Sequence, residues 1–581
     1  MRSKAPPGRL GLALSYVPIA SVFVLLVPLV ALAWNASYST IGRDQGIFQY
    51  IAWAVSQGDV DYKDVRDVNG PLTHLVHRIF LLFGSRDEHI FRSLDLAVTG
   101  AVFAFLGWML PGISRKANTA FEEPSYVTRA FWSVASLVLL GAQYLHYLYW
   151  DLAQRESFSN WFMLPAALFA LRALEPSFEL DGDKKKARAW MISGALSGIA
   201  VFGKPTYAFF GIAIVFFLLL DREALLDRKQ RFMAYALGVL VGVAAMVLFV
   251  VITGDLRAGA SSYLGDARLY AMMWRRPAAD IFTLPWGMKQ HLWAGAAFGM
   301  TLLLVLFRQA PTRLLLLPVL PIVGYAAIVV QGKGFPYHFH PVSAGLQLAG
   351  LGVWAWAFER TRSETLQGDS NGRKTAYALA HVGAAVGSLL VGRSLVESSP
   401  FRGATDLRIE GAHRETRETE KFFQRYRSHD FFPWEMREVA VYLKSRTDPR
   451  SKVQTYGVDP YLLFLAERKS ASPFIYAFDL NFDASAAGAR DQIRDPSELS
   501  EMLGRLEKKR ADHEAEMLEI FIEAPPAAFV FFDHAPFLSD PDALVDFATH
   551  NPKAASYLET NYELTKKVGP LRVWLRKDRG P

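Results

Sequence analysis

The acids best suited to proton transfer lie in a polar stretch, residues 41–78, that directly follows a long apolar segment. The stretch reads IGRDQGIFQYIAWAVSQGDVDYKDVRDVNGPLTHLVHR. Its first acid, Asp44, precedes Ile47 and Phe48 by three and four residues, the spacing that places side chains on one helical face. A carboxylate on an apolar face points inward, where it can serve as a general base. The simpler alternative is that Asp44 is only the N-cap of this helix.

Two short helices are expected within this stretch. The first follows Asp44 and buries Ile51 and Val55, while Gln45 and Gln49 take its polar face. The second begins at Asn-Gly-Pro, residues 69–71, with proline in the first turn, and it carries His74, His77 and Arg78. The turn between the helices holds Asp61, Asp64 and Asp67. We expect Asp61 to be solvated, whereas Asp67 is either solvated or part of a functional site.

The order RDQG, YIA and QGDVDYKDVRDVNGPL resembles the first extracytoplasmic loop of the GT-C superfamily of integral-membrane glycosyltransferases. The members that it resembles most use a polyprenyl-phosphate sugar as donor, such as aminoarabinose and protein O-mannosyl transferases. The resemblance implies that Asp44 is the catalytic base and that Asp67, if it is not merely solvated, contacts the sugar or the acceptor. Family members often carry lysine where this chain has Asn69, so the resemblance implies that Arg66, His77 or Arg78 supplies the charge for the lipid phosphate.

Three further motifs resemble positions of the same family: QRESF at 154–158, GKP at 203–205 and QGKGFPYHFHP at 331–341. The resemblance implies that Glu156 is a second catalytic acid and that Arg155 contacts the sugar or the acceptor. A local ion pair between Arg155 and Glu156 is the alternative. Lys204 is expected at the donor phosphate, or else as a lysine that anchors its helix at the membrane surface.

The third motif has two glycines, two prolines, a lysine and two histidines, which indicates a loop that re-enters a helix bundle. Lys333 and His338 can hold a phosphate by charge-assisted hydrogen bonds, and His340 is expected at the sugar or the acceptor. Interfacial anchoring is the alternative. The pairs His74 with His77 and His338 with His340 have unfavourable spacing for one metal site, so we expect no metal and no cofactor.

The composition is that of a membrane protein. The 581 residues are 51% hydrophobic and 13% aromatic, with positive mean hydropathy. The net charge of +7 comes mainly from basic residues in short loops, which membrane orientation explains better than nucleic-acid binding does. The chain has no cysteine, which excludes disulfides, cysteine metal sites and a thiol nucleophile.

Eleven apolar runs have membrane-spanning length, near residues 10–34, 89–110, 126–149, 157–174, 189–203, 206–220, 232–253, 287–307, 314–330, 337–357 and 375–392. With a cytoplasmic amino terminus, every short inner loop is basic, and the inner set is Arg115, Lys116, Lys184, Lys185, Lys186, Arg188, Arg228, Lys229, Arg231, Arg308, Arg313, Arg360, Arg362, Arg373 and Lys374. The short outer loops hold single basic residues. The pattern predicts that the chain from about residue 393 onward is periplasmic, at a bacterial inner membrane.

We therefore expect an α-helical polytopic membrane protein of about eleven transmembrane helices with a C-terminal extracytoplasmic α/β domain. The expected parts are a transmembrane catalytic domain at 1–392, whose first extracytoplasmic loop is 35–88, a charged connector at 393–435 and a periplasmic domain at 436–581. In that last domain the sequence predicts helices at 435–446, 460–467 and 497–521, and strands at 452–458, 473–478, 527–533 and 571–577.

The function that these patterns favour is metal-independent transfer of a sugar from a polyprenyl-phosphate donor to a lipid, polysaccharide or protein acceptor on the periplasmic side. A polysaccharide polymerase or ligase that uses a pyrophosphate-linked donor is the nearest alternative. A secondary transporter would place its polar groups at mid-membrane, whereas here they lie at span ends. A non-catalytic protein that presents its outer domain to a partner is a further alternative. No motif indicates a nucleic-acid partner.

Overall fold

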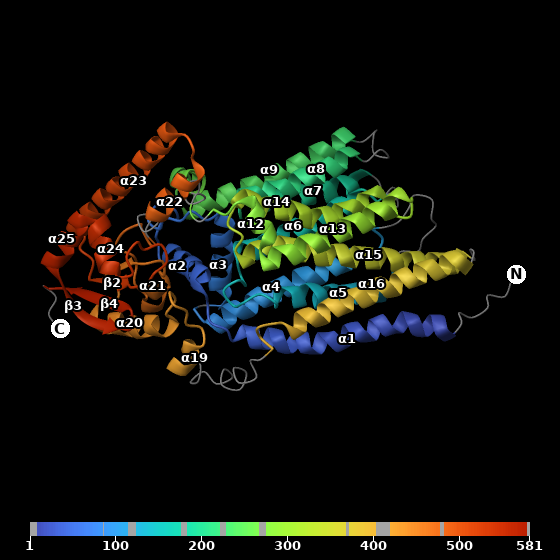
Figure 1. Cartoon of the computed structure of the whole chain (residues 1–581), viewed down its shortest axis with the longest axis horizontal. Helices are drawn as coiled ribbons and strands as arrows, with labels where there is room; N and C mark the ends of the chain where they lie inside the picture. Colours follow the sequence, from blue (N-terminus) through green and yellow to red (C-terminus); the bar gives the residue numbers. More distant parts are fainter. Residues whose placement is uncertain are drawn as a thin grey trace. The chain divides into compact units, whose positions relative to one another are not determined.

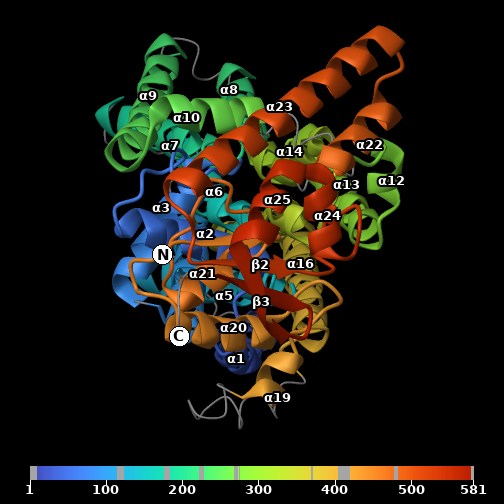
Figure 2. The same cartoon turned by 90° about the vertical axis from the view of Figure 1, so that its left-hand side faces the viewer.

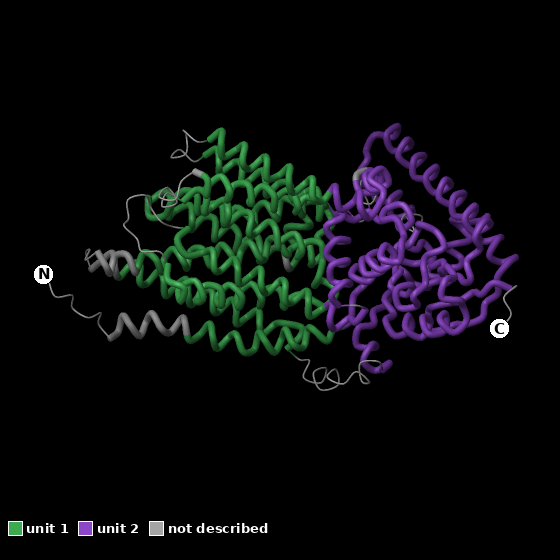
Figure 3. The backbone as a smooth tube through the Cα atoms, turned by 180° about the vertical axis from the view of Figure 1, so that it is seen from behind, with its two compact units in different colours: residues 1–39, 92–246, 277–408 green, residues 40–91, 247–276, 409–581 purple. Residues whose placement is uncertain are grey.

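The computed structural model describes residues 9–84, 86–113, 124–175, 183–220, 228–266, 273, 275–367, 371–402, 419–476 and 482–577. Two compact units, each built from segments distant in sequence, are coloured in Figure 3. Unit 1 comprises residues 1–39, 92–246 and 277–408, and unit 2 comprises residues 40–91, 247–276 and 409–581. Arg115, Lys116 and residues 403–418 of the predicted connector lie outside the described residues, as do the side chains of Arg362, Arg373 and Lys374.

Long helices that run side by side dominate unit 1 (Figure 1). Each predicted apolar run overlaps one of them: α1 (Arg9–Ser37), α4 (Glu88–Met109), α5 (Tyr126–Tyr144), α6 (Arg155–Ala173), α7 (Asp183–Val201), α8 (Ala208–Leu220), α9 (Arg228–Thr253), α13 (Pro285–Leu306), α14 (Leu316–Gln331), α15 (His340–Gln367) and α16 (Asn371–Glu397). Short elements join them: η2 (Pro205–Tyr207), α12 (Ala278–Thr283), η4 (Thr312–Leu315) and η5 (Pro336–Phe339).

Five stretches of the described residues are long and apolar enough, by length and composition, to cross a membrane. They are Ala20–Ser37, Glu88–Met109, Arg228–Thr253, Thr312–Gln331 and Thr375–Glu397. Helix α9 illustrates the pattern, since it exposes Leu237, Leu240 and Leu248, an apolar surface suited to lipid. The helical membrane fold is therefore confirmed, while the count of eleven spans and their orientation remain predictions.

Glycines allow a close helix contact in unit 1, between α7 and α9. A Cβ atom on Gly194 would lie 2.0 Å from the carbonyl oxygen of Tyr235, and one on Gly238 would lie 2.0 Å from that of Met191. Gly198 and Gly242, four residues further along each helix, face backbone in the same way. Small residues four apart let membrane helices approach backbone to backbone, which gains van der Waals packing where lipid supplies no hydrophobic drive.

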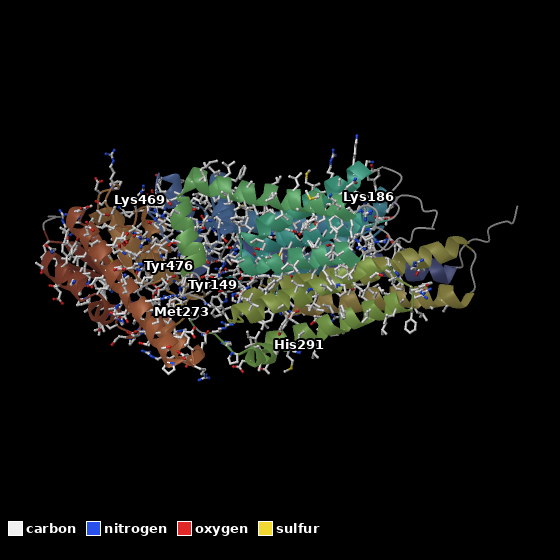
Figure 4. The ribbon with its side chains drawn as sticks, turned by 90° about the horizontal axis from the view of Figure 1, so that it is seen from above. Tyr149, Lys186, Met273, His291, Lys469 and Tyr476 are labelled. Atoms are coloured by element: carbon white, nitrogen blue, oxygen red, sulfur yellow. The ribbon has the colours of Figure 1, made fainter. Side chains whose placement is uncertain are left out.

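The loops of unit 1 gather at two ends of its helices. Figure 4 shows Tyr149, from the segment between α5 and α6, and Lys186, at the start of α7, at opposite ends. Tyr149 and Lys186 lie at opposite ends because α6, the one helix between them, runs from one end to the other. The same alternation of direction between consecutive helices places the QRESF, GKP and QGKG motifs, which follow α5, α7 and α14, at the same end as Tyr149.

Unit 2 combines the first polar stretch with the C-terminal region. The former provides α2 (Arg43–Ser56) and α3 (Pro71–Gly84), and residues 247–276 add α10 (Leu256–Ala260) and η3 (Ser261–Asp266). The C-terminal region contributes α19 (Glu420–Gln424), α20 (Pro433–Arg446), β1 (Val453–Tyr456), α21 (Tyr461–Ala466), α22 (Phe482–Gln492), α23 (Pro496–Glu523), β2 (Ala528–Phe532), α24 (Ala543–His550), α25 (Pro552–Asn561), β3 (Tyr562–Val568) and β4 (Leu571–Arg576).

The four strands form one mixed sheet in the order β1-β2-β4-β3. Strands β1 and β2 are parallel, and β4 pairs antiparallel with both β2 and β3. In Figures 1 and 2 the sheet lies between α20 and the pair α24 and α25. Every residue of β2 is buried, which agrees with a strand covered on both faces. Phe529 and Phe531 pack with Phe521 of α23 and Phe547 of α24 in one core.

The structure differs from the prediction for this region at one expected strand and at one strand that was not expected. The segment predicted as a strand at 473–478 is irregular over its described part, 473–476. Pairing with β1 is limited to a single bridge between Val453 and Ser470. Beyond it, the backbone N–H and the hydroxyl of Ser472 donate to the side-chain oxygen of Gln454, so these bonds replace a strand ladder. Strand β3 escaped prediction because its central residues are polar and exposed. Its lysines, Lys566 and Lys567, suit an unpaired sheet edge.

Candidate active site

Asp44 lies in the first turn of α2 and is half-buried. It is not the N-cap, so that alternative is wrong: Gly42 takes the position, and its backbone N–H donates to Gln45 Oε1 at 2.5 Å. The side chain of Gln45 thus supplies the capping interaction. Asp44 is left for another role at the positive end of the helix dipole, where a carboxylate is favoured in its charged form.

Helix α2 is buried on more sides than its pattern predicts. Gln45 and Gln49, expected on a solvated face, are 0% and 3% exposed. That prediction is wrong because α2 packs against both α3 and α21. Gly46 marks the contact with α21, since a Cβ atom there would lie 2.7 Å from Tyr461 Cβ. The helix that carries Asp44 is therefore fixed along its length.

The turn between α2 and α3 is organised by His74. Its Nδ1 lies 2.9 Å from Asp61 Oδ2 and its Nε2 lies 2.8 Å from Asp67 Oδ2, and Tyr62 stacks on the ring. Burial lowers the pKa of His74, but the two carboxylates outweigh it and raise the pKa to about 10. The ring is an imidazolium that donates to both acids. The expectation of a solvated Asp61 is wrong, since it is 1% exposed.

Arg66 and Asp67 have partners within unit 2. Arg66 Nη2 donates to both carboxylate oxygens of Glu516 at 2.9 Å, and its guanidinium lies 4.7 Å from the Phe474 ring centroid. Asp67 also accepts from Asn69 Nδ2 at 2.6 Å and from the hydroxyl of Tyr476. These contacts indicate structural roles for both residues, and their predicted contacts with donor phosphate and sugar remain predictions. His77 packs between Phe48 and Phe91, with ring centroids 5.3 and 5.1 Å away.

In unit 1 the structure brings together five residues from three motifs, which we call the basic cluster: Arg155, Glu156, Lys204, Lys333 and His338. Arg155 and Glu156 form the first turn of α6, Lys204 precedes η2, Lys333 lies between α14 and η5, and His338 is in η5. Gly332 and Gly334 adopt positive φ angles of 71° and 64°, which lets the chain turn sharply around Lys333. The sequence predicted each member, and tertiary folding joins them.

Glu156 is the hub of the basic cluster. Its side chain is fully buried, Lys204 Nζ donates to its Oε1, and His338 Nε2 lies 3.6 Å from the same oxygen. Lys204 Nζ also donates to Gln331 Oε1 at 2.8 Å, and Gln331 Nε2 donates to Thr206 Oγ1 at 2.9 Å. Within the described part of the chain, Glu156 Oε2 and His338 Nδ1 are buried without a hydrogen-bond partner. Buried polar atoms of this kind suit a ligand that satisfies them.

Positive charge prevails around Lys333, which is 6% exposed. Burial, and then the positive charges of Lys204 and Arg155, lower the pKa of Lys333 to about 6. A buried set of three basic side chains with one carboxylate among them attracts an anion, since an anion restores the charge balance that burial penalises. The arrangement can therefore bind a phosphate.

His340 lies apart from this role. Its Nε2 donates to the backbone carbonyl of Asp151 at 2.7 Å, and its ring centroid is 4.0 Å from that of Tyr147. Tyr147 in turn shares a hydrogen bond of 2.8 Å with Ser343. These contacts join η5 and α15 to the segment after α5. The predicted contact of His340 with sugar or acceptor stays a prediction.

Sequence reasoning missed several partners of these residues. Gln331 stands in the QGKG motif but was given no role, although it holds Lys204. Asp459, which pairs with Arg43, lies three residues after the end of β1, and an acid shortly after a buried strand is a signal that the sequence carries. Tyr476, the partner of Asp67, lies in the segment wrongly predicted as a strand.

Comparison with known families finds a partial match. Residues 126–252 match the family described as dolichyl-phosphate-mannose-protein mannosyltransferase. The dolichol phosphate-mannose mannosyltransferase of Haloferax volcanii is 29% identical over 97 residues, which cover 17% of this chain and 21% of that protein. The chain thus spans about a fifth of the length of this curated relative.

Comparison with solved structures finds matches along nearly the whole chain. ArnT from Cupriavidus metallidurans, bound to undecaprenyl phosphate, matches with a TM-score of 0.53 and 14% identity over 96% of this chain and 99% of that one. The oligosaccharyltransferase AglB from Archaeoglobus fulgidus, in complex with an inhibitory peptide and a dolichol-phosphate, has 12% identity, covers 98% and 75% of the two chains and has a TM-score of 0.47, too low to indicate a fold by itself. The chain shares the fold of ArnT.

Proposed function

We propose that this protein is a membrane glycosyltransferase that moves a sugar from a polyprenyl-phosphate carrier to an acceptor on the extracytoplasmic side of its membrane. The basic cluster carries the proposal, because a buried lysine, a half-buried lysine, an arginine and a histidine lie together with buried atoms that have no partners among the described residues. The shared fold and the partial family match support the same class of enzyme. In ArnT, undecaprenyl phosphate is the bound lipid, and we infer a lipid phosphate for this chain as well.

The basic cluster would stabilise the leaving group. When the bond between the anomeric carbon and the phosphate oxygen breaks, its electron pair stays on that oxygen, and the polyprenyl phosphate gains negative charge. Lys204, Lys333 and His338 can stabilise this charge by donating hydrogen bonds to the phosphate oxygens. Because lysines neutralise the phosphate, the proposed step needs no metal ion.

Asp44 would act as the general base. An acceptor hydroxyl or amine attacks the anomeric carbon from the side opposite the phosphate, and Asp44 takes the proton that the attacking atom loses. A single displacement of this kind inverts the configuration at the anomeric carbon. The carboxylate suits the role because it is half-buried and is not used as the N-cap of its helix.

Of the remaining predicted residues, Glu156 and Arg155 would contact the sugar or the acceptor. Glu156 has one carboxylate oxygen free of partners among the described residues, so it can accept a hydrogen bond from a sugar hydroxyl. Arg155, its neighbour, is nearly buried and can donate to the sugar or to the phosphate. Asp67 and His340 would act mainly by holding their loops. We assign the acceptor side to the periplasm of a bacterial inner membrane from the distribution of lysine and arginine.

Mass spectrometry of lipid that co-purifies with the protein tests the donor class. A polyprenyl phosphate or its sugar ester is the expected lipid. A pyrophosphate-linked lipid would instead favour the polymerase or ligase alternative, and absence of any polyprenyl lipid, together with no measurable binding of undecaprenyl phosphate, would contradict the proposal.

Alanine at Lys333 or His338 should weaken binding of undecaprenyl phosphate by about ten- to a hundredfold. Each variant loses one charge-assisted contact, typically about 1.5 to 3 kcal/mol. The measurement is a titration of the lipid into protein in detergent, alongside thermal unfolding to show that the variant is folded. Lys184→Ala, which removes an exposed lysine at the start of α7, is the matched control. If both site variants bound undecaprenyl phosphate with wild-type affinity, the loop at residues 331–341 would be a membrane anchor and not a phosphate site.

Lys333 should also make lipid binding depend on pH. Its pKa of about 6 means that it is mostly neutral at pH 7 to 8, and a bound phosphate anion would raise that pKa. Binding then takes up a proton, so affinity should fall by up to about tenfold per pH unit above pH 6. Lys333→Arg keeps its charge throughout.

The informative quantity is the ratio of wild-type to Lys333→Arg affinity for undecaprenyl phosphate between pH 6 and 8. Titration of the lipid phosphate itself cancels in that ratio. The ratio should fall as pH rises, and a flat ratio would mean that Lys333 does not change protonation on binding.

A further inference from the structure

The contacts of Arg43, the residue before the proposed base, connect the first polar stretch to the C-terminal region within unit 2. Arg43 Nε donates to Asp459 Oδ1 at 3.0 Å, and its Nη1 donates to Asp430 Oδ2 at 3.1 Å. Its Nη2 donates to the backbone carbonyl of Asp430, and the guanidinium lies 5.6 Å from the Phe431 ring centroid. Three of the five guanidinium donors are thus used by residues about 390 to 415 positions later in the chain.

The two acids are themselves held in place. Asp459 is 2% exposed and lies between β1 and α21, where its backbone carbonyl accepts from Leu462 N–H at 3.2 Å. Asp430 accepts from Ser428 Oγ at 2.6 Å. A fork of hydrogen bonds to two fixed carboxylates restricts the guanidinium far more than one flexible ion pair does. Because Arg43 and Asp44 are consecutive residues in the first helical turn, this restraint also fixes the backbone of Asp44.

The charge balance adds to the geometry. Burial raises the pKa of Asp459 most, Arg43 opposes that rise, and the charges of Asp430 and Asp44 add smaller rises. The charge of Asp44 therefore reaches Asp459. Arg43 forms ion pairs with both Asp459 and Asp430, and its positive charge favours the ionised forms of these two acids.

We propose that the C-terminal region positions the base: Asp459 and Asp430 hold Arg43 and thereby fix the first turn of α2, which carries Asp44. This inference rests on the proposed function, since it assigns Asp459 and Arg43 as positioning residues for that base. It also gives the α/β region, for which the sequence indicated no role, a part in the reaction. A base that shifts by about 1 Å can lose about a hundredfold in rate.

The other end of α2 offers a matched comparison. There Lys469, labelled in Figure 4, donates to Asp59 Oδ1 at 2.6 Å and to the backbone carbonyl of Gln57 at 2.9 Å. The pair joins the same two segments as Arg43 and Asp459 but lies at the carboxyl end of the helix, three turns away from Asp44. Asp59→Asn weakens docking of α2 without touching its first turn.

The test is a double-mutant cycle of Asp459→Asn with Asp44→Asn. A panel of undecaprenyl-phosphate-linked hexoses and pentoses is screened first with wild-type protein. The compound from which the protein releases undecaprenyl phosphate is the donor probe. Asp459→Asn alone should lower kcat by about ten- to a hundredfold, while the affinity for undecaprenyl phosphate changes less than twofold. In the Asp44→Asn background it should cause no further loss, because a misplaced base matters only while the base is present. Asp59→Asn should change kcat less than threefold.

Three results would overturn the inference. They are wild-type kcat for Asp459→Asn, an equal loss of kcat for Asp59→Asn, and a full additional loss in the Asp44→Asn background. Each of these leaves the proposed function intact if Asp44→Asn alone is inactive. Failure of the proposed function is seen separately, as release of undecaprenyl phosphate from no member of the panel. Normal turnover by Asp44→Asn would instead assign the base to another residue and would also overturn this inference.

Discussion

Replacing Asp44 by asparagine should lower the rate of sugar transfer by about a hundredfold or more, the usual loss for a missing general base. Asparagine has the size of aspartate but accepts no proton. This substitution leaves the N-terminal cap of α2 intact, because the cap is formed by Gly42 and Gln45 and not by Asp44. The favourable interaction of the carboxylate with the helix dipole is lost, which is about 0.3 to 1 kcal/mol.

The measurement compares kcat with the affinity for undecaprenyl phosphate and with the midpoint of thermal unfolding. The catalytic role predicts a large fall in kcat with little change in the other two. Asp44→Glu should also be poor, since one added methylene moves the carboxylate away from the attacking atom. Near wild-type transfer by Asp44→Asn would show that another group is the base, and Glu156 would be the next residue to change.

Replacing Lys204 by methionine should both destabilise the protein and abolish most lipid binding. Lys204 is the hydrogen-bonded partner of Glu156, whose side chain is 1% exposed. Removing one partner of a buried ion pair typically costs about 3 to 5 kcal/mol, because the other charge is left buried and uncompensated. The variant should therefore unfold at a lower temperature than wild type, and it also lacks a lysine of the proposed phosphate site.

The double variant Lys204→Met with Glu156→Gln separates these two effects. It contains no buried unpaired carboxylate, so it should recover most of the lost stability, yet its affinity for undecaprenyl phosphate should stay at least tenfold below that of wild type. If Lys204 were only an anchor at the membrane surface, Lys204→Met would unfold at nearly the wild-type temperature. Recovery of both stability and affinity in the double variant would place the phosphate elsewhere.

The apolar runs determined the helices of unit 1 without help from tertiary structure. Runs of this length have few alternatives in a membrane, because backbone groups without water must bond within their own segment. The strands β1, β2 and β4 were also predictable, since β2 is a short apolar run, β4 alternates apolar residues with arginine, and β1 contains the strand-favouring residues valine, threonine and tyrosine. The residues of the basic cluster stood out individually, as charges at the ends of apolar runs are costly unless they are paired or used.

Tertiary structure decided which of those charges meet. Glu156, Lys204 and Lys333 are far apart in sequence, and no local pattern says that Lys204 bonds to both Glu156 and Gln331. The same limit explains the errors around Asp44. A periodic pattern describes one buried face, but α2 has α3 on one side and α21, more than 400 residues later, on another, so Gln45 and Gln49 are buried as well. Asp61 became a partner of His74 for the same reason: local spacing specifies which face a side chain takes, whereas only the folded chain specifies what covers that face.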